Sequence, residues 1–371
     1  MKTNQKLREV GQSLWLDGIT RDLLNSGTFK HYIEELSVTG LTSNPIIFDY
    51  ALKHSSAYDS TIRKKLKEDR LGEELYFELT LEDLSHAADL LRPIYERTDG
   101  MDGWVSLDVS PIQSHETTSI LAAAKDLYAR VRRPNLFIKI PGNKEGLPAV
   151  EEAIFAGIQV NVTLLFSREH YLAAAEAFLR GIERRIAAGL KPNVASVASL
   201  LIDRWDEAVN GKVPDALRNQ LGIAIARCTY KAYRQFLSSP RWERAFNNGA
   251  RPQRLLWAST VTKDPKALDA FQIKSLVAPL TVRSMSETTL KAFSENAEID
   301  DLMSADGGDC EVVLARFAQA GIDIDALAAQ LQSQETDLQV KSWIGLMTVI
   351  ASRSATLTTN HHIDREKEAK A

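Results

Sequence analysis

Short apolar runs alternate with longer stretches of helical periodicity along most of the chain. The apolar runs are typical of buried strands and lie at residues 13–17, 38–44, 104–109, 135–141, 159–165, 194–200, 255–260 and 275–282, the last interrupted by Pro279. Residues 171–186, which follow a polar cap at Ser167, and 221–237 carry apolar residues at helical spacing. Eight repeated strand–helix units predict a parallel (β/α)8 barrel.

An open doubly wound sheet is the competing architecture. It would need a glycine-rich phosphate loop after its first strand, and residues 16–20 (Leu-Asp-Gly-Ile-Thr) do not form one. We therefore expect one barrel domain over residues 1–371, with a helical insertion at about 55–97 and further helices at about 311–356 packed outside the barrel. Residues 360–371 are polar and charged, and we expect them to fray.

Composition narrows the class of protein. The 371 residues are 44% hydrophobic and 25% charged, as in globular proteins, and the net charge of -4 argues against nucleic-acid or membrane partners. Because no apolar run is long enough for a signal or a membrane span, we expect a cytoplasmic protein. The only two cysteines, Cys228 and Cys310, lie far apart in helical segments, which argues against a disulfide framework.

The fourth apolar run, Asn-Leu-Phe-Ile-Lys-Ile-Pro, contains a single lysine, Lys139. A strand that is apolar on both faces belongs in a covered parallel sheet, where an ammonium costs several kcal/mol unless it is paired. A lowered pKa would instead leave a neutral amine, which can attack a carbonyl. A lysine that protects an edge strand from aggregation is the alternative, and this run alone does not decide between the two.

Polar residues also end the other predicted strands. Active sites of (β/α)8 barrels form where the carboxyl ends of the strands meet. Each such residue alone could be a helix cap, a turn residue or a satisfied core hydroxyl. Their agreement across seven strands predicts a site made of Asp17, Asn44, Asp108, Lys139, Asn161, Thr163, Ser199 and Ser259.

Schiff-base chemistry fits these residue types. Lys139 could form an imine with a ketone, and the imine would stabilise the carbanion left when an adjacent C–C bond breaks. Asp17 could remove the hydroxyl proton, while Asp108 and Thr163 could relay protons through a held water. The seven histidines show no spacing typical of a zinc site.

The remaining candidates would hold the substrate. Asn44 and Asn161 can donate and accept hydrogen bonds, as sugar hydroxyls require. Arg204, five residues after Ser199, could bind a phosphate together with Ser199 and Ser259, although an arginine at this position is equally compatible with a surface role.

These motifs, in this order, resemble the transaldolases over nearly the whole chain, and most closely the longer bacterial branch of that family. The resemblance is carried by Leu-Trp-Leu-Asp at 14–17, Gly-Leu-Thr-Ser-Asn-Pro at 40–45, Val-Ser-Leu-Asp-Val at 105–109, Phe-Ile-Lys-Ile-Pro at 137–141, Val-Asn-Val-Thr-Leu at 160–164 and Leu-Trp-Ala-Ser-Thr at 256–260. It implies a cofactor-free, metal-free barrel that moves a dihydroxyacetone unit from a ketose phosphate to an aldose phosphate, typically in the pentose phosphate pathway. We expect a monomer or a homodimer.

The same resemblance implies roles for individual residues. Lys139 would be the Schiff-base lysine, Asp17 the acid/base, and Thr163 would hold the catalytic water. Asn44 and Asn161 would bind the dihydroxyacetone hydroxyls, and the phosphate would lie among Ser199, Arg204 and Ser259. An aldolase with a different donor or acceptor, and a non-catalytic barrel that binds sugar phosphates, are the alternatives.

Departures from the family pattern concern the substrate loops. Asp108 replaces the usual glutamate, so its carboxylate would sit about 1 Å further back, enough to slow a proton relay. Arg283-Ser-Met-Ser replaces Asn-Thr-Met-Pro, and we expect Arg283 to bind an anion at the rim of the site. Leu201 replaces an aromatic residue common next to the bound sugar, Val261 replaces a glycine in the seventh loop, and Ile46 stands where a small residue is usual. We therefore expect a transaldolase specialised for an unusual sugar phosphate.

Overall fold

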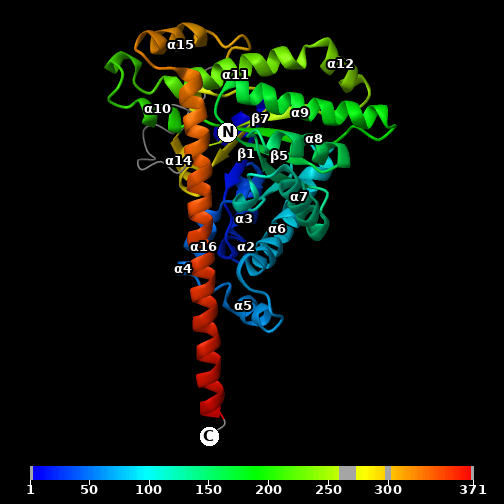
Figure 1. Ribbon diagram of the computed structural model, residues 1–371, viewed down its shortest axis with the longest axis vertical. Helices are drawn as coiled ribbons and strands as arrows, with labels where there is room; N and C mark the ends of the chain where they lie inside the picture. Colours follow the sequence, from blue (N-terminus) through cyan, green and yellow to red (C-terminus); the bar gives the residue numbers. More distant parts are fainter. Residues whose placement is uncertain (1–2, 259–272, 297–301, 369–371) are drawn as a thin grey trace.

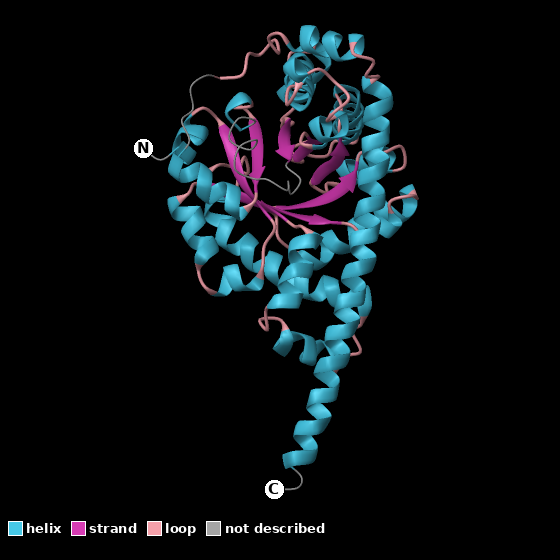
Figure 2. Cartoon of the chain, turned by 90° about the vertical axis from the view of Figure 1, so that its left-hand side faces the viewer, coloured by secondary structure: helices cyan, strands magenta, loops and turns pink. Residues whose placement is uncertain are grey.

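The strands form a closed barrel in which each strand runs parallel to its neighbours and the order around the barrel is the order along the chain. Figure 2 shows the strands with helices around them. The computed structural model describes residues 3–258, 273–296 and 302–368. The strands are β1 (Gln12–Asp17), β2 (Val38–Thr42), β3 (Trp104–Asp108), β4 (Leu136–Pro141), β5 (Val160–Leu165), β6 (Ser196–Leu201), β7 (Gln253–Ala258) and β8 (Thr281–Met285). The prediction of a (β/α)8 barrel is confirmed.

Helices surround the barrel and fill most of the chain between the strands (Figure 1). They are α1 (Thr3–Glu9), α2 (Arg21–Asn25), α3 (Thr28–Glu35), α4 (Pro45–His54), α5 (Asp59–Leu66), α6 (Gly72–Arg97), α7 (Thr117–Val131), α8 (Gly146–Ala156), α9 (Arg168–Ala187), α10 (Arg204–Val209), α11 (Leu221–Leu237), α12 (Pro240–Asn247), α14 (Glu287–Asn296), α15 (Cys310–Gln319) and α16 (Ile324–Glu368), with 3-10 turns at Pro111–Gln113 and Asp215–Leu217. The expected cap is present, since Ser167 accepts a hydrogen bond from the His170 amide at 3.1 Å. Among the described helices, none has both the length and the apolar character that a membrane span requires.

A layer of large apolar side chains fills the barrel interior on the side toward the amino ends of the strands. Its members are Trp15, Trp104, Phe137, Val197, Leu256 and Val282, and the rings of Trp104 and Phe137 stack with centroids 4.1 Å apart. Alternate residues of a strand share a face, so the next inward position lies two residues further along each strand. Those positions hold Asp17, Ser106, Lys139, Ser199, Ala258 and Ser284. Strand register therefore puts a largely polar layer directly above an apolar one.

Gly40 in β2 makes room for this apolar layer. A Cβ atom at residue 40 would clash with the indole ring of Trp15, so the close approach of the two strands requires glycine here. The indole takes the space that a side chain on β2 would otherwise fill.

The eighth strand lies later in the chain than expected. Residues 273–275 are helical, and β8 begins only at Thr281. Pro279 has no N–H to donate to a ladder, and Leu280 has a left-handed φ of 59°, so neither fits a strand interior. Arg283 consequently lies within β8 and not in the loop that follows it.

The C-terminal helix α16 is a single helix of 45 residues that crosses one end of the barrel and then extends past the rest of the molecule (Figures 1 and 2). Gln332 donates to the Leu164 carbonyl at 2.8 Å, and the buried Trp343 packs edge-on against Tyr76 of α6, with ring centroids 4.7 Å apart. We expected the helices at about 311–356 only to pack outside the barrel, and this was incomplete because α16 also contacts the strand end at Leu164. The segment that we expected to fray, from residue 360, is helical as far as Glu368, and residues 369–371 lie outside the described part of the chain.

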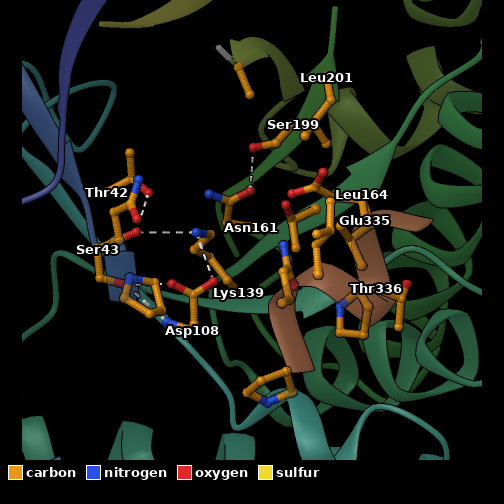
Figure 3. A pocket seen from close by; sticks show the side chains of 18 of the residues that line it. Thr42, Ser43, Asp108, Lys139, Asn161, Leu164, Ser199, Leu201, Glu335 and Thr336 are labelled. Atoms are coloured by element: carbon orange, nitrogen blue, oxygen red, sulfur yellow. Dashed lines mark hydrogen bonds and ion pairs between the residues drawn. The ribbon is translucent and has the colours of Figure 1, made fainter. Parts of the chain in front are cut away.

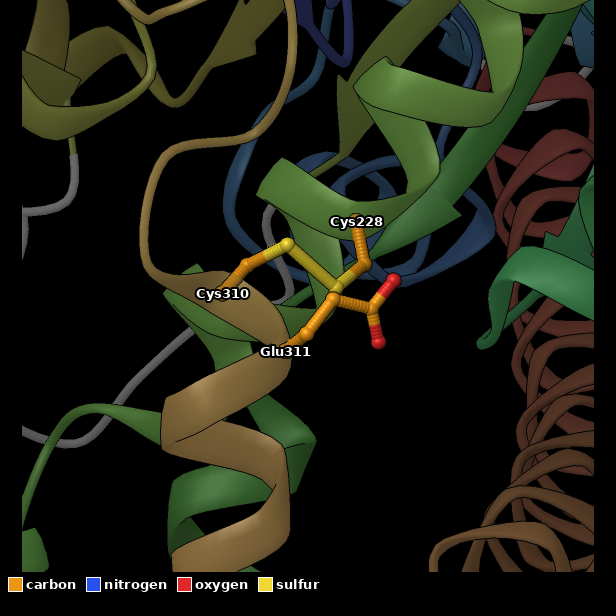
Figure 4. Close-up of side chains that lie close together, drawn as sticks. All are labelled: Cys228, Cys310 and Glu311. Carbon is orange, nitrogen blue, oxygen red and sulfur yellow. A yellow bond between two sulfur atoms is a disulfide. The ribbon is translucent and has the colours of Figure 1, made fainter.

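Cys228 and Cys310 form a disulfide, contrary to the expectation from their separation in sequence (Figure 4). Cys228 lies in α11 and Cys310 is the first residue of α15, and these two helices pack together so that the Cα atoms are 5.7 Å apart. The bond closes a separation of 82 residues along the chain. It ties the segment that leads into α16 to the body of the barrel.

Candidate active site

A cavity of about 250 Å³ opens at the carboxyl ends of the strands (Figure 3). Eight of the ten predicted site residues line it. They are Asp17, Asn44, Asp108, Lys139, Asn161, Thr163, Ser199 and Arg204. The barrel therefore brings together side chains that are up to 187 residues apart in sequence, from Asp17 to Arg204.

Lys139 lies between two partners at the centre of this cavity. Its Cα is in register with those of Asp108 on β3 and Asn161 on β5, so the three side chains point inward side by side. The Lys139 Nζ is 2.7 Å from Asp108 Oδ1 and donates to the Ser43 carbonyl oxygen at 3.3 Å. Because removing an ammonium from water is costly, a lysine in a barrel interior is expected either to be paired as an ammonium or to be a neutral amine. Here the Lys139 amine is paired with the Asp108 carboxylate.

Ser43 holds the Asp108 carboxylate in place. Its hydroxyl donates to Asp108 Oδ2 at 2.7 Å and accepts from the Asp108 amide at 3.2 Å. The shorter side chain at residue 108 thus still reaches Lys139. Ser43 was missed as a site residue because a serine beside Asn44 at a strand end has no distinctive spacing.

Asp17 enters the cavity from β1 and is paired with an amide. Asn44 Nδ2 donates to Asp17 Oδ2 at 3.2 Å, while Asn44 Oδ1 caps α4 by accepting from the Ile46 amide at 3.0 Å. Burial raises the pKa of Asp17 to about 6, with the Asp108 charge adding to the effect and the Lys139 charge and the Asn44 bond opposing it. A carboxyl group with this pKa can exchange a proton near neutral pH.

A chain of hydrogen bonds orients Asn161. Ser199 Oγ donates to Asn161 Oδ1 at 2.7 Å, and Asn161 Nδ2 donates to Ser106 Oγ at 3.1 Å. Both ends of the amide are thereby fixed, and the side chain is held beside Lys139.

The end of β5 departs from regular pairing next to Thr163. The register with β6 shifts between Val162 and Leu165, and Leu164 has a left-handed φ of 61°, which is uncommon for a residue with a branched side chain. The carbonyl oxygen of Leu164 accepts the hydrogen bond from Gln332 of α16. The C-terminal helix therefore both covers the cavity and holds the strand end that carries Thr163.

Arg204, the first residue of α10, is engaged by two carboxylates. Its Nη2 is 3.3 Å from Glu335 Oε2 of α16 and its Nη1 is 3.2 Å from Glu207 Oε2. Sequence reasoning missed the contribution of α16, which supplies Glu335, Thr336, Leu338, Gln339 and Ser342. Helical spacing groups them on one face, but nothing in the sequence says which surface that face covers.

Of the ten predicted site residues, Arg283 does not line the cavity, and Ser259 lies outside the described residues. Arg283 is buried but is not among the lining residues. Its neighbours Val282 and Ser284 face the barrel interior, so alternation along β8 directs Arg283 to the outer side of the barrel. The expectation that it stands at the rim of the site was wrong because Arg283 is an outward-facing residue of β8.

Two of the three other departures from the family pattern lie at the cavity. Leu201 is buried and Ile46 is exposed, and both line the cavity. Val261 lies outside the described part of the chain.

A closed (β/α)8 barrel with a lysine, carboxylates and amides converging at the carboxyl ends of its strands has the organisation of an enzyme of this fold. The sequence model described as Transaldolase/Fructose-6-phosphate aldolase matches residues 14–350. The chain belongs to this family, and its activity is that of a transaldolase.

The chain is similar in sequence to proteins named transaldolase over almost their entire length. A protein named transaldolase from Thermobifida fusca is 40% identical over 363 residues, covering 95% of this chain and 99% of the relative. One from Parafrankia sp. is 39% identical over 353 residues, covering 93% and 96%. One named transaldolase 2 from Nostoc punctiforme is 34% identical over 380 residues, covering 96% and 100%.

Proposed function

We propose that the chain transfers a dihydroxyacetone unit from a ketose phosphate, of the fructose 6-phosphate or sedoheptulose 7-phosphate type, to an aldose phosphate through a Schiff base on Lys139. The observation that carries the proposal is the 2.7 Å contact between Lys139 Nζ and Asp108 in a cavity that also contains Asp17. The reaction belongs to pentose phosphate metabolism or to a specialised sugar pathway.

The first step makes the imine. The Lys139 ammonium gives a proton to Asp108, and the neutral amine attacks the ketone carbon of the donor. The resulting carbinolamine loses its hydroxyl group as water, with the proton returned from Asp108 through a water held by Thr163. Ser43 serves this step by keeping the Asp108 carboxylate against the lysine.

The second step breaks and remakes a C–C bond. Asp17 takes the proton of the donor's β-hydroxyl group, the C–C electron pair moves toward the imine nitrogen, and the aldose phosphate leaves. The enamine that remains attacks the aldehyde of the acceptor, and Asp17 returns its proton to the new hydroxyl group. Water then hydrolyses the imine and frees the product.

The other residues position the sugar. Asn44 and Asn161 bind the hydroxyls of the dihydroxyacetone unit, and Arg204 binds the phosphate with Ser199 and Ser259. Asn44 and Asn161 are each already oriented by a second hydrogen bond, which favours a fixed geometry for the bound unit. A monomeric or homodimeric state and a cytoplasmic location belong to the proposal as predictions for light scattering and cell fractionation.

Product analysis tests the proposal. Fructose 6-phosphate incubated with the enzyme should give a new ketose phosphate only when an aldose phosphate acceptor is present. Steady release of free dihydroxyacetone without an acceptor would instead establish the aldolase alternative. Binding of the sugar phosphate without any adduct on Lys139 after borohydride reduction would establish the non-catalytic alternative.

A further inference from the structure

A partly buried carboxylate from the C-terminal helix forms an ion pair with the arginine that the substrate's phosphate would need. Glu335 lies 3.3 Å from the Arg204 guanidinium, and its side chain is only 12% exposed. The second carboxylate on Arg204, Glu207, is 68% exposed and does not line the cavity. Water screens Glu207, whereas burial raises the pKa of Glu335 and Arg204 opposes that rise.

The charges around the cavity are unusual for a site that binds a dianion. Among the described residues that line it, the charged ones are three carboxylates (Asp17, Asp108, Glu335) and two cations (Lys139, Arg204). When all are ionised, their sum is negative. A pocket that favours a phosphate would carry the opposite sign.

Arg204 also has limited capacity for a second anion. Each of its two terminal nitrogens already has a carboxylate partner, and its buried Nε–H has no acceptor among the described residues. A phosphate bound through two parallel N–H groups, the strong geometry for arginine, would have to displace one of the carboxylates. Glu335 is the one inside the cavity (Figure 3).

We propose that Glu335 is a specificity-determining residue whose carboxylate competes with the substrate's terminal phosphate for Arg204. It thereby weakens the binding of dianionic ligands relative to sugars whose distal end is neutral, and it can accept a hydrogen bond from a distal hydroxyl group. The inference rests on the proposed function in one respect, that Arg204 meets the distal end of the substrate.

The test replaces Glu335 by glutamine and uses Glu207→Gln as the matched control, since both carboxylates contact Arg204. Inorganic phosphate is the probe, titrated by calorimetry and as a competitive inhibitor of the ketose phosphate. Glu335→Gln should lower the phosphate dissociation constant about tenfold, as expected when one like charge beside a partly buried anion is removed. It should lower KM for fructose 6-phosphate in parallel and change kcat less, whereas Glu207→Gln should change each constant less than about twofold.

Weaker phosphate binding in Glu335→Gln would show that the carboxylate orients Arg204 for the phosphate, and unchanged binding would show that the two do not compete. Either result overturns the proposal. Glu335→Ala gives a second variant that also removes the charge, and circular dichroism checks the folding of both. Calorimetry does not depend on imine chemistry, so failure of this inference is distinguishable from failure of the Schiff-base proposal.

Discussion

Replacing Asp17 by asparagine should stabilise the protein at neutral pH while removing most of its activity. In the folded protein, burial raises the pKa of this carboxyl group from 3.8 to about 6. A difference of about 2 pKa units corresponds to about 3 kcal/mol. We discount this to about 2 kcal/mol because Asp17 lines the cavity and remains partly accessible to solvent.

The sign follows from proton binding in the two states. The folded protein binds this proton more tightly than the unfolded chain does, so the protonated carboxyl favours folding below about pH 4. That contribution is lost as the pH rises through about 6, where the buried carboxylate is ionised. Asparagine resembles the protonated form, so Asp17→Asn should match the wild type at pH 4 and exceed its unfolding free energy by about 2 kcal/mol at pH 8.

Urea denaturation at the two pH values measures the effect, and a steady-state transfer assay measures the activity. We expect kcat to fall at least about 100-fold, because the base is lost, and kcat/KM of the wild type to fall below about pH 6. Asp108→Asn is the contrasting variant. It leaves the Lys139 ammonium without its carboxylate and should destabilise the protein at pH 8. If Asp17→Asn gained no stability at pH 8, or gained equally at pH 4, the burial argument would be refuted.

Three further variants test other parts of the structure. Gly40→Ala should destabilise the protein by about 1–3 kcal/mol in urea denaturation, because the added methyl group meets the Trp15 indole. Ser43→Ala should lower kcat about tenfold with a smaller change in KM, because the Asp108 carboxylate loses the hydroxyl that orients it. Cys228→Ser should lower the unfolding free energy under oxidising conditions by up to about 4 kcal/mol, from the loop entropy of the lost disulfide.

Each of these three predictions has a matched control. Gly345→Ala places a methyl group on α16 where, apart from the helix's own backbone, no atom of the described residues lies within 4 Å, and it should be neutral or slightly stabilising. If Gly40→Ala behaved in the same way, the packing argument for β2 would be wrong. Ser43→Thr retains the hydroxyl and should recover part of the lost kcat. Reductant should lower the Tm of the wild type but leave that of Cys228→Ser unchanged, and equal responses would contradict a disulfide.

The sequence was sufficient to predict the barrel and eight of the residues that line the cavity. Each strand end carries its chemistry locally, as Asp17 and Lys139 do, and the fold rule that strand ends meet at one face supplies the rest. The error at β8 arose where an apolar run, a proline and a left-handed residue overlap around Pro279 and Leu280. An apolar run alone does not distinguish a strand from a helix followed by a turn.

The residues of the site that the sequence did not predict lie on α16 and are placed there by tertiary packing. Glu335 belongs to a helix whose position over the barrel depends on contacts such as those of Gln332 and Trp343, which no local pattern encodes. The pairing of Cys228 with Cys310 is likewise a consequence of which helices pack together. The packing of the C-terminal helices against the barrel was therefore the feature that the sequence alone did not predict.

Borohydride reduction in the presence of fructose 6-phosphate tests the central claim most directly. Intact-mass and peptide mass spectrometry should find one reduced three-carbon adduct, on the peptide that contains Lys139, and none in Lys139→Met. An adduct on a different lysine, or no adduct across a panel of ketose phosphates that the enzyme turns over, would contradict the account.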